Sequence, residues 1–469
     1  MAISALPYPS TITRDSARWM KRSLWITLVT GLLTFWLSAQ VRQHALVGGD
    51  GLAYFLYARS LVVDLDTNLH DEILDMNERV PADSSVIWSV NDLAEIDTDT
   101  REAELPWPIG AGLVHAPFYA AGLLGEALRA VITGSPIDTY GWIPQVFFCL
   151  GSLVFGWLGF CLTLRLVARA FPASRAIAST AAIFFAGPAV FYIFFHPSMS
   201  HAASFGLAAW LVLQFWDAWH EAPRHAFLMG LTLGLMGIIR YQNGLFGLLL
   251  IAVAIRELAR SGWRPALRFA SIGMLGCALP LLLQLWHVEV NSLEGPASVS
   301  SEGGVVATRF RAIDLTAPHA WDALWSSNHG AFTWTPVLLL GTLGVLIAAL
   351  RHGWARLALL LLAINVYLIG TTEQWWGGSS FGMRYLIELT PFFALGLATL
   401  LTSVLGEGTP RPVWRWTTWG SLGVLILWNL LLIAAFGLET IPHSDPVPFA
   451  AMAEGVGEVF TRIAEVLTH

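Results

Sequence analysis

The stretch LVGGDGLAYFLYARSLV, residues 46–62, places an aspartate between glycines at the end of the first long apolar segment of the chain. Asp50 is flanked by Gly49 and Gly51, and aromatic and aliphatic residues lead from it to Arg59. A carboxylate at such a junction faces water on one side of a membrane or the other. The topology of the whole chain therefore decides which chemistry is open to Asp50.

The composition is that of a membrane protein. The chain has 469 residues, of which 55% are hydrophobic and 13% charged, and its mean hydropathy is +0.60. These values exclude a soluble globule. The first apolar run follows four basic residues, is too long for a signal peptide and lacks a cleavage site, which predicts a retained span. The three cysteines lie in apolar runs without the spacing of metal ligands, so we expect neither disulfides nor a metal centre.

The charges are distributed unevenly along the chain. Residues 46–106 carry fourteen Asp or Glu and three Arg, a net charge of −11, so the remainder of this chain of net charge −7 carries +4. This division indicates one acidic, water-exposed segment attached to a membrane-embedded body.

Eleven apolar runs predict an all-α polytopic membrane protein with about eleven transmembrane helices, within a range of ten to thirteen. With a cytoplasmic N-terminus, sixteen of the 26 Lys and Arg residues lie inside, as the positive-inside rule requires. Residues 1–437 then form a transmembrane domain with outer loops at 46–141 and 289–332, and an outer tail at 438–469 contains an amphipathic helix. The predicted spans are residues 23–45, 142–164, 176–195, 201–218, 226–239, 244–258, 268–288, 333–350, 355–371, 384–405 and 417–437.

One further apolar segment, PIGAGLVHAPFYAAGLLGEALRAVI at residues 108–132, tests this topology. If it crossed the membrane, Arg165, Arg169 and Arg175 would face outward and the bias of positive charge would reverse downstream. We therefore expect a re-entrant or interfacial element that returns to the outer face, within a first loop that contains short amphipathic helices.

Two arginines at the outer ends of spans do not fit the orientation rule. Arg240 lies in GIIRYQNGL and Arg384 in TEQWWGGSSFGMRYLIELTP, while FFHPSMSHAASF places His196 and His201 at another outer junction. Arginine binds phosphate bidentately and stays ionised. The neighbouring Trp residues offer flat faces for a sugar or an isoprenoid, so the combination suits a lipid-linked phosphosugar.

At these residues the chain resembles the GT-C superfamily of membrane glycosyltransferases, which includes the protein O-mannosyltransferases and the aminoarabinose transferase of lipid A. The matching stretches are GGDGLAYFLYARSLVVDLD, LPWPIGAGLVHAPFY, HPSMSHAASF, RYQNGL and WWGGSSFGMRYL, and they cover most of the chain between Leu46 and Leu405. The resemblance implies an outward-facing active site, an inverting reaction and Asp50 as the catalytic carboxylate. Some members carry two adjacent acids at this point, whereas Gly51 follows here, which leaves Asp64 or Asp66 as a candidate second acid.

The expected reaction is transfer of a sugar from a polyprenyl-phosphate donor to a glycan, glycolipid or protein acceptor at the periplasmic face of a bacterial inner membrane. Because the donor brings a good leaving group, one base and cationic phosphate ligands suffice. Asp50 is assigned as general base, and the donor phosphate or lipid is assigned to Arg240, Arg384, His201 and Arg59. Sugar or acceptor contacts are assigned to Tyr54, His115, Asn243, Glu373, Trp375 and Trp376. We expect no cofactor, although a divalent metal is not excluded. The expected partners are the donor, the acceptor and membrane lipids, with no nucleic acid. The chain is expected to be a monomer.

Other interpretations of these residues stay open. The arginines could be anchors that extend toward the interface, the histidines could be hydrogen-bonding residues at helix ends, and most of the 22 tryptophans form an interfacial belt. The alternative functions are a transporter or flippase of a lipid-linked sugar, which does not need a base at Asp50, and a lipid-binding scaffold. The sequence names neither the sugar nor the acceptor.

Overall fold

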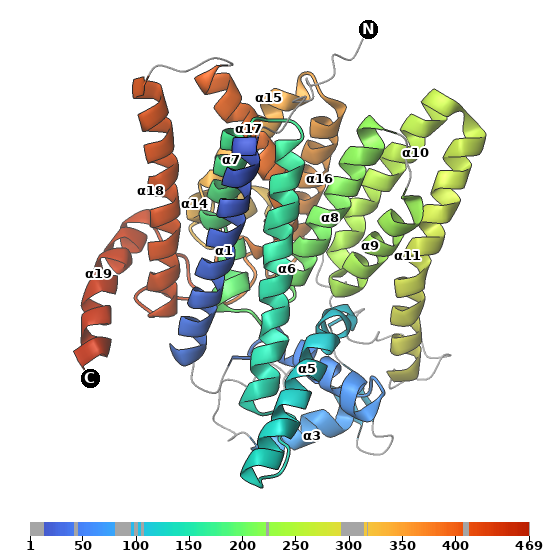
Figure 1. Ribbon diagram of the computed structural model, residues 1–469, viewed down its shortest axis with the longest axis vertical. Helices are drawn as coiled ribbons and strands as arrows, with labels where there is room; N and C mark the ends of the chain where they lie inside the picture. The colour runs from blue at the N-terminus through green and yellow to red at the C-terminus, as the bar shows by residue number, and fades with distance from the viewer. Residues whose placement is uncertain are drawn as a thin grey trace. The chain divides into compact units, whose positions relative to one another are not determined.

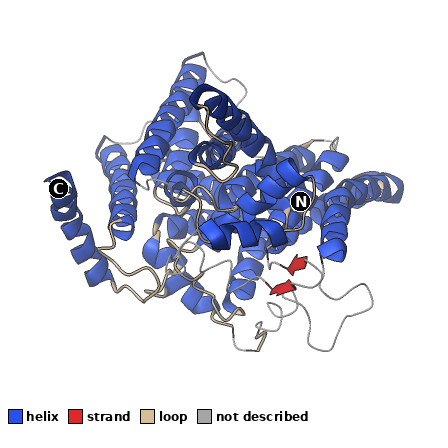
Figure 2. Ribbon diagram, turned by 90° about the horizontal axis from the view of Figure 1, so that it is seen from below, coloured by secondary structure: helices blue, strands red, loops and turns tan. Residues whose placement is uncertain are grey.

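The computed structural model describes residues 14–41, 46–79, 95–97, 102–104, 107–221, 225–291, 314–316, 318–406 and 412–468. Helices make up nearly all of these ranges (Figure 1). One antiparallel hairpin joins β1 (Glu95–Asp97) and β2 (Glu102–Glu104), with Ile96 opposite Ala103 (Figure 2). The predicted all-α architecture is confirmed.

Each of the eleven apolar runs falls on a helix. In chain order these helices are α1 (Arg14–Val41), α6 (Trp142–Ala168), α7 (Ala173–Phe185) with the π-helical turn η2 (Phe191–Phe195), α8 (His201–His220), α9 (Ala226–Ile239), α10 (Gly247–Ser261), α11 (Trp263–Asn291), α15 (Val337–Ala349), α16 (Gly353–Gly370), α17 (Thr390–Leu405) and α18 (Pro412–Gly437). Five segments are long and apolar enough to cross a membrane, namely Trp142–Ala168, Trp263–Val288, Gly353–Gly370, Arg384–Leu405 and Trp416–Gly437, while α7, α9 and α15 are apolar but shorter. The chain is a multi-pass membrane protein.

The segment at residues 108–132 forms one continuous helix, α5 (Gly110–Thr133), with Pro117 near its start. Like the predicted spans α1, α8 and α10, it is not among the five segments that are long and apolar enough to cross a membrane. Leu124 and Leu128 on its second half are exposed, whereas Glu126 and Arg129 form an ion pair of 2.5 Å. Such a helix, apolar on one face and polar on another, is typical of an interfacial element, and its position at the outer face stays a prediction.

The chain divides into two compact units that interleave in sequence. Unit 1 consists of residues 1–28, 160–191 and 313–469, and unit 2 of residues 29–159 and 192–312.

Unit 2 contains the predicted first outer loop and the helices α8 to α11. The loop folds into α2 (Asp50–Arg59), the π-helical turn η1 (Ser60–Asp64), α3 (His70–Arg79) and α5, while the 3-10 helix η3 (Tyr241–Phe246) connects α9 to α10. The most extensive packing is between α9 and α11, where Gly230 lies against the backbone of Gly273 and Gly276 against that of Phe227. Glycines at a helix crossing let two backbones approach closely, as is usual in membranes.

Unit 1 is built around α15 and α17, with α7 and α16 packed on them. A Cβ on Gly344 of α15 would collide with the carbonyl oxygen of Gly396 of α17, and one on Gly396 with the carbonyl oxygen of Gly341. The short helices α13 (Ala320–Trp325), α14 (Ala331–Trp334) and η4 (Arg384–Leu389) precede or join these spans. The predicted amphipathic tail helix is α19 (Phe449–Thr468), which packs on α18.

Candidate active site

Asp50 is the first residue of α2 and lies in a glycine loop formed by Gly48, Gly49 and Gly51. Gly49, the N-cap, has a φ of +57°, a backbone conformation that glycine adopts without strain. Gly51 lies so close to Ser198 that a Cβ would overlap its side chain. The glycines around the carboxylate are therefore needed for one left-handed turn and for one close approach.

The segment at residues 196–204 is the partner of this glycine loop. Gly48 N donates to Ser198 Oγ at 3.4 Å, and Ser198 Oγ lies 3.3 Å from Gly48 O. His196 is also near, since its Cε1 lies 3.8 Å from the position that a Cβ on Gly49 would take. Two of the sequence stretches that we expected at one site, separated by about 150 residues, thus lie in contact.

Arg240, at the end of α9, contacts the segment at residues 196–204 through His201. Its Nη1 is 3.1 Å from His201 Nε2 and 3.3 Å from His201 Nδ1, and its Nη2 donates to Gln242 Oε1 at 3.2 Å. Because the guanidinium can only donate, His201 accepts at the contacting nitrogen. His201 is fully buried at the start of α8, with the ring of Tyr192 at 4.6 Å.

Asn243, a predicted sugar contact, is buried and holds the turn after Arg240. Its Nδ2 donates to Ser204 Oγ at 2.6 Å and to Met236 O at 3.0 Å. The amide therefore ties η3 to α8 and α9, which fixes the backbone that carries Arg240.

His115 of α5 is linked to the segment at residues 196–204 through Ser152. Its Nδ1 lies 2.8 Å from Ala111 O and its Nε2 3.3 Å from Ser152 Oγ, and the Ser152 hydroxyl in turn donates to Pro197 O. Burial lowers the pKa of His115 to about 4, so the ring is neutral at pH 7 and Nδ1–H donates to the carbonyl. Tyr54, which is 4% exposed, packs within α2 where Gly112 of α5 crosses it.

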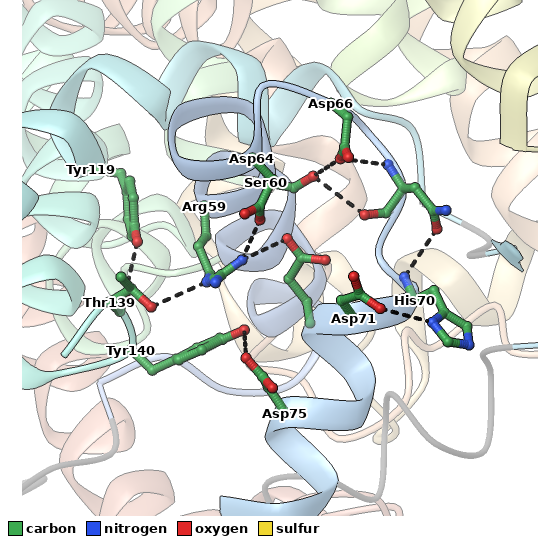
Figure 3. A network of polar contacts seen from close by, with 12 residues as sticks. Arg59, Ser60, Asp64, Asp66, His70, Asp71, Asp75, Tyr119, Thr139 and Tyr140 are labelled. Carbon is green, nitrogen blue, oxygen red and sulfur yellow. Dashed lines mark hydrogen bonds and ion pairs between the residues drawn. The ribbon is translucent and has the colours of Figure 1, made fainter. Parts of the chain in front are cut away.

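Arg59 lies in an ion-pair network at the other end of α2 (Figure 3). Its Nη1 is 2.5 Å from Asp64 Oδ2 and 2.9 Å from Glu72 Oε1, and its Nε donates to Thr139 Oγ1 at 3.2 Å. The guanidinium also lies 4.7 Å above the centre of the Tyr140 ring. These contacts hold η1 and α3 against the turn between α5 and α6.

Asp64 and Asp66, the two candidate second acids, both lie near Arg59. Asp64 pairs with Arg59, and Asp66 Oδ1 accepts from Ser60 Oγ at 2.7 Å and from Asn68 N at 3.1 Å. The pKa of Glu72 is raised to about 8, mainly by burial and also by a hydrogen bond to Asp64, while a backbone hydrogen bond and the charge of Arg59 oppose the shift. At neutral pH Glu72 is therefore protonated.

The remaining predicted residues, Arg384, Trp375, Trp376 and Glu373, lie in unit 1. Arg384 begins η4, and its guanidinium lies 5.3 Å from the centre of the Tyr385 ring. Trp375 is buried and stacks on His319 at 5.9 Å, whereas Glu373 is exposed.

Four buried or half-buried residues in these regions escaped the sequence analysis. His287 Nε2 lies 3.3 Å from Tyr57 Oη, and Gln284 Oε1 accepts from Ile109 N at 3.1 Å, so both join α11 to the first loop. In unit 1 His329 and His443 lie close to the segment of Arg384. The sequence held no usable signal, because each of the four is a single polar residue in an apolar helix or an unpatterned loop.

A metal ion has no evident site in the part of the chain that the structure describes. Within these ranges no group of three or more His, Cys, Asp or Glu residues has the arrangement of metal ligands.

The described helices have the same fold as two solved structures. Both are of ArnT from Cupriavidus metallidurans, an aminoarabinose transferase. The apo structure matches with a TM-score of 0.53 and 14% identity over 97% of this chain and 71% of that chain. The structure bound to undecaprenyl phosphate matches with a TM-score of 0.51 and 15% identity over 94% and 70%. No protein-family model and no curated protein matches the sequence.

Proposed function

We propose that this chain is a glycosyltransferase that moves a sugar from a polyprenyl-phosphate donor to an acceptor at the outer face of the bacterial inner membrane. One observation carries the proposal: within a GT-C fold, the segment at residues 196–204 contacts both the glycine loop of Asp50 and the Arg240 guanidinium. The binding of undecaprenyl phosphate by ArnT supports a polyprenyl-phosphate ligand.

In this mechanism Asp50 removes the proton of an acceptor hydroxyl, and the oxygen attacks the anomeric carbon. The bond from that carbon to the phosphate oxygen breaks in the same displacement, so the configuration inverts and polyprenyl phosphate leaves. Arg240, oriented by its contact with His201, stabilises the charge that develops on the phosphate.

The central test is Asp50→Asn, assayed with a panel of polyprenyl-phosphate sugars and with mass spectrometry of the products. The amide cannot act as a base, so turnover should fall by about a thousandfold or more, while donor binding stays within roughly threefold. Asp71→Asn, in an exposed acid of the same loop, is the matched control and should keep its activity. Near wild-type turnover by Asp50→Asn would remove the base role from Asp50, whereas lipid movement without sugar transfer by the wild type would favour a transporter.

The phosphate ligands are tested separately. Arg240→Ala should weaken the binding of undecaprenyl phosphate by about tenfold or more, because a charge-assisted bidentate contact is lost. Arg384→Ala tests the second predicted ligand in the same assay, and Arg351→Ala, in an exposed arginine after α15, is the control. Unchanged affinity in both Arg240→Ala and Arg384→Ala would remove the phosphate role from the two residues.

A further inference from the structure

The turn between α10 and α11 carries four arginines. Arg256 and Arg260 lie near the end of α10, and Arg264 and Arg268 near the start of α11. Only Gly262, in a left-handed conformation with a φ of +89°, separates the two helices, which pack on each other within unit 2 (Figure 1). Two helices thus bring four guanidinium groups to one end of a helical hairpin.

The positive charge of this hairpin is poorly compensated by the protein. Each helix places its two arginines four residues apart, a spacing at which like charges are neighbours and destabilise the helix. Residues 247–288 contain Glu257 as their only acid, so with neutral His the net charge of the hairpin is +3. Within the described ranges, none of the four guanidinium groups forms an ion pair or a hydrogen bond. An anion from outside the chain would relieve this repulsion.

The protein contacts of two of these arginines are aromatic. The guanidinium of Arg256 lies 4.4 Å from the centre of the Trp219 ring of α8, and that of Arg264 lies 5.3 Å from the centre of the Trp263 ring. A ring face orients a guanidinium but leaves its charge without a counter-ion.

Exposed apolar side chains continue the surface of α11 beyond the arginines. Leu275 and Leu279 follow Arg268 on the same helix face and are 59% and 50% exposed. At a rise of 1.5 Å per residue they lie roughly 10 and 16 Å from Arg268 along the axis, which is about the depth of one leaflet. Of the five segments that can cross a membrane, α11 has the lowest buried share, 28%. The helix therefore offers a long apolar face to acyl chains.

This combination favours a lipid over a soluble anion. Trp263 and Leu267 are exposed among the arginines, and a free phosphate ion gains nothing from apolar neighbours. Trp is common at the depth of the lipid headgroups. The positive-inside rule accounts for basic residues on one side of the membrane, but it does not require two like-charged pairs at the end of one exposed apolar face.

We propose that Arg260, Arg264 and Arg268 bind the headgroup of an anionic membrane phospholipid, whose acyl chains lie along the exposed face of α11. The guanidinium forks donate to the phosphate oxygens, and the negative charge offsets the repulsion within each pair. Arg256, held over Trp219, adds to the positive potential. The site goes beyond the proposed function, because it requires neither Asp50 nor a sugar donor.

The test uses the full-length protein without its native cysteines, reconstituted in phosphatidylcholine vesicles that contain a minor fraction of brominated phosphatidylglycerol or brominated phosphatidylcholine. Met274→Cys, at an exposed position next to Leu275, carries a fluorophore that nearby brominated chains quench. Because each arginine near a membrane raises its affinity for anionic lipid about fivefold, the local preference for phosphatidylglycerol should be about tenfold or more. High salt should reduce this preference. Both leaflets have the same composition, so the result does not depend on the orientation of the chain.

A second reporter position separates the site from the average lipid boundary. Leu285→Cys is exposed on the same helix but lies roughly 26 Å from Arg268 along the axis, near the other leaflet. A fluorophore there should show a preference for phosphatidylglycerol of less than about twofold. An equal preference at Met274→Cys and Leu285→Cys would contradict a local site.

A double variant and a matched control complete the test. Arg264→Gln with Arg268→Gln should reduce the preference at Met274→Cys to about twofold or less, because the phosphate ligands are lost. Arg351→Gln with Arg356→Gln removes the same charge from the turn between α15 and α16 and should leave the preference unchanged. Equal quenching by the two brominated lipids in the wild type, the result expected if only a soluble anion occupies the turn, would overturn the proposal. An unchanged preference in the first double variant would overturn it as well, whatever the test of the proposed transferase shows.

Discussion

At the scale of single residues, the position of Asp50 depends on glycines that have different tasks. A Cβ on Gly51 would overlap the side chain and approach the carbonyl oxygen of Ser198, whereas one on Gly48 would meet nothing within 4 Å. Ser198 is held in turn by its neighbour Pro197, whose carbonyl accepts from Ser152, and Ser152 contacts His115. The carboxylate is thus located by contacts beneath the loop and not by its own sequence neighbours alone.

These contacts predict a sharp difference between two neighbouring glycines. Gly51→Ala should lower kcat about a hundredfold, because the added methyl group displaces the loop and a shift of about 1 Å at a reacting group costs this much. Gly48→Ala, one turn earlier, should change kcat less than about threefold. Donor affinity should be similar in both variants, since Arg240 is not moved. Steady-state kinetics and a donor-binding assay check this, and equal effects of the two substitutions on kcat would contradict it.

At the scale of elements, Arg59 joins α2, η1, α3 and the turn after α5. The guanidinium contacts Asp64, Glu72 and Thr139 at once, and Tyr140 extends the network to Asp75 through a hydrogen bond of 3.3 Å (Figure 3). With these partners, Arg59 has a structural role in the first loop that accounts for its position. A contact to the donor lipid stays a prediction from the sequence.

The protonated state of Glu72 makes the stability of this network depend on pH. Its pKa is raised from 4.5 to about 8 in the folded chain, so the folded state binds more protons than the unfolded state between these values. The contribution of Glu72 to the free energy of unfolding is therefore fully present below about pH 4.5. It is lost as the pH rises through about 8. Thermal unfolding between pH 6 and pH 9 should show a falling Tm in the wild type.

Glu72→Gln provides the control for this prediction. The amide resembles the protonated acid and cannot ionise, so the decline in Tm above pH 7 should become shallower. Asp71→Asn, in the exposed acid next to it, should leave the wild-type slope unchanged. A Tm that rises with pH in the wild type, or an identical slope in Glu72→Gln, would show that Glu72 is already ionised at neutral pH.

At the scale of the whole molecule, the arrangement of positive charge predicts which loops face the cytoplasm. The turn between α10 and α11 carries Arg260 and Arg264, both exposed, whereas the first loop is strongly acidic. In the eleven-span topology the first loop is outside and this turn is inside. The proposed reaction at the outer face depends on that orientation.

Accessibility of introduced cysteines tests the orientation directly. In a background without the three native cysteines, Asp71→Cys should react with an impermeant maleimide in spheroplasts, and Arg260→Cys only after the membrane is permeabilised. Both positions are exposed, so a lack of reaction reports the side of the membrane and not burial. The reverse pattern would place Asp50 on the cytoplasmic side and end the case for an outer-face transferase.

The sequence by itself determined the helices and much of the fold class. A bilayer requires apolar helices whose backbone groups bond within the segment, so hydropathy located all eleven helical runs. That α5 does not span the membrane stays a prediction from the charge bias. The sequence also selected Asp50, His201 and Arg240, because a charged or titratable group at the end of an apolar span is uncommon. Hydropathy and the charged residues at span ends are local properties of the sequence, so they can be recognised without knowledge of the tertiary contacts.

Only the tertiary structure decided which polar groups meet. The contact of Gly48 with Ser198 joins residues about 150 positions apart, and that of Tyr57 with His287 joins residues 230 apart. It likewise gave Arg59 its acidic partners and brought His329 beside Arg384. The physical reason is that helix formation in a membrane follows from local hydropathy, whereas a hydrogen-bond partner depends on how the helices pack, which no local pattern encodes.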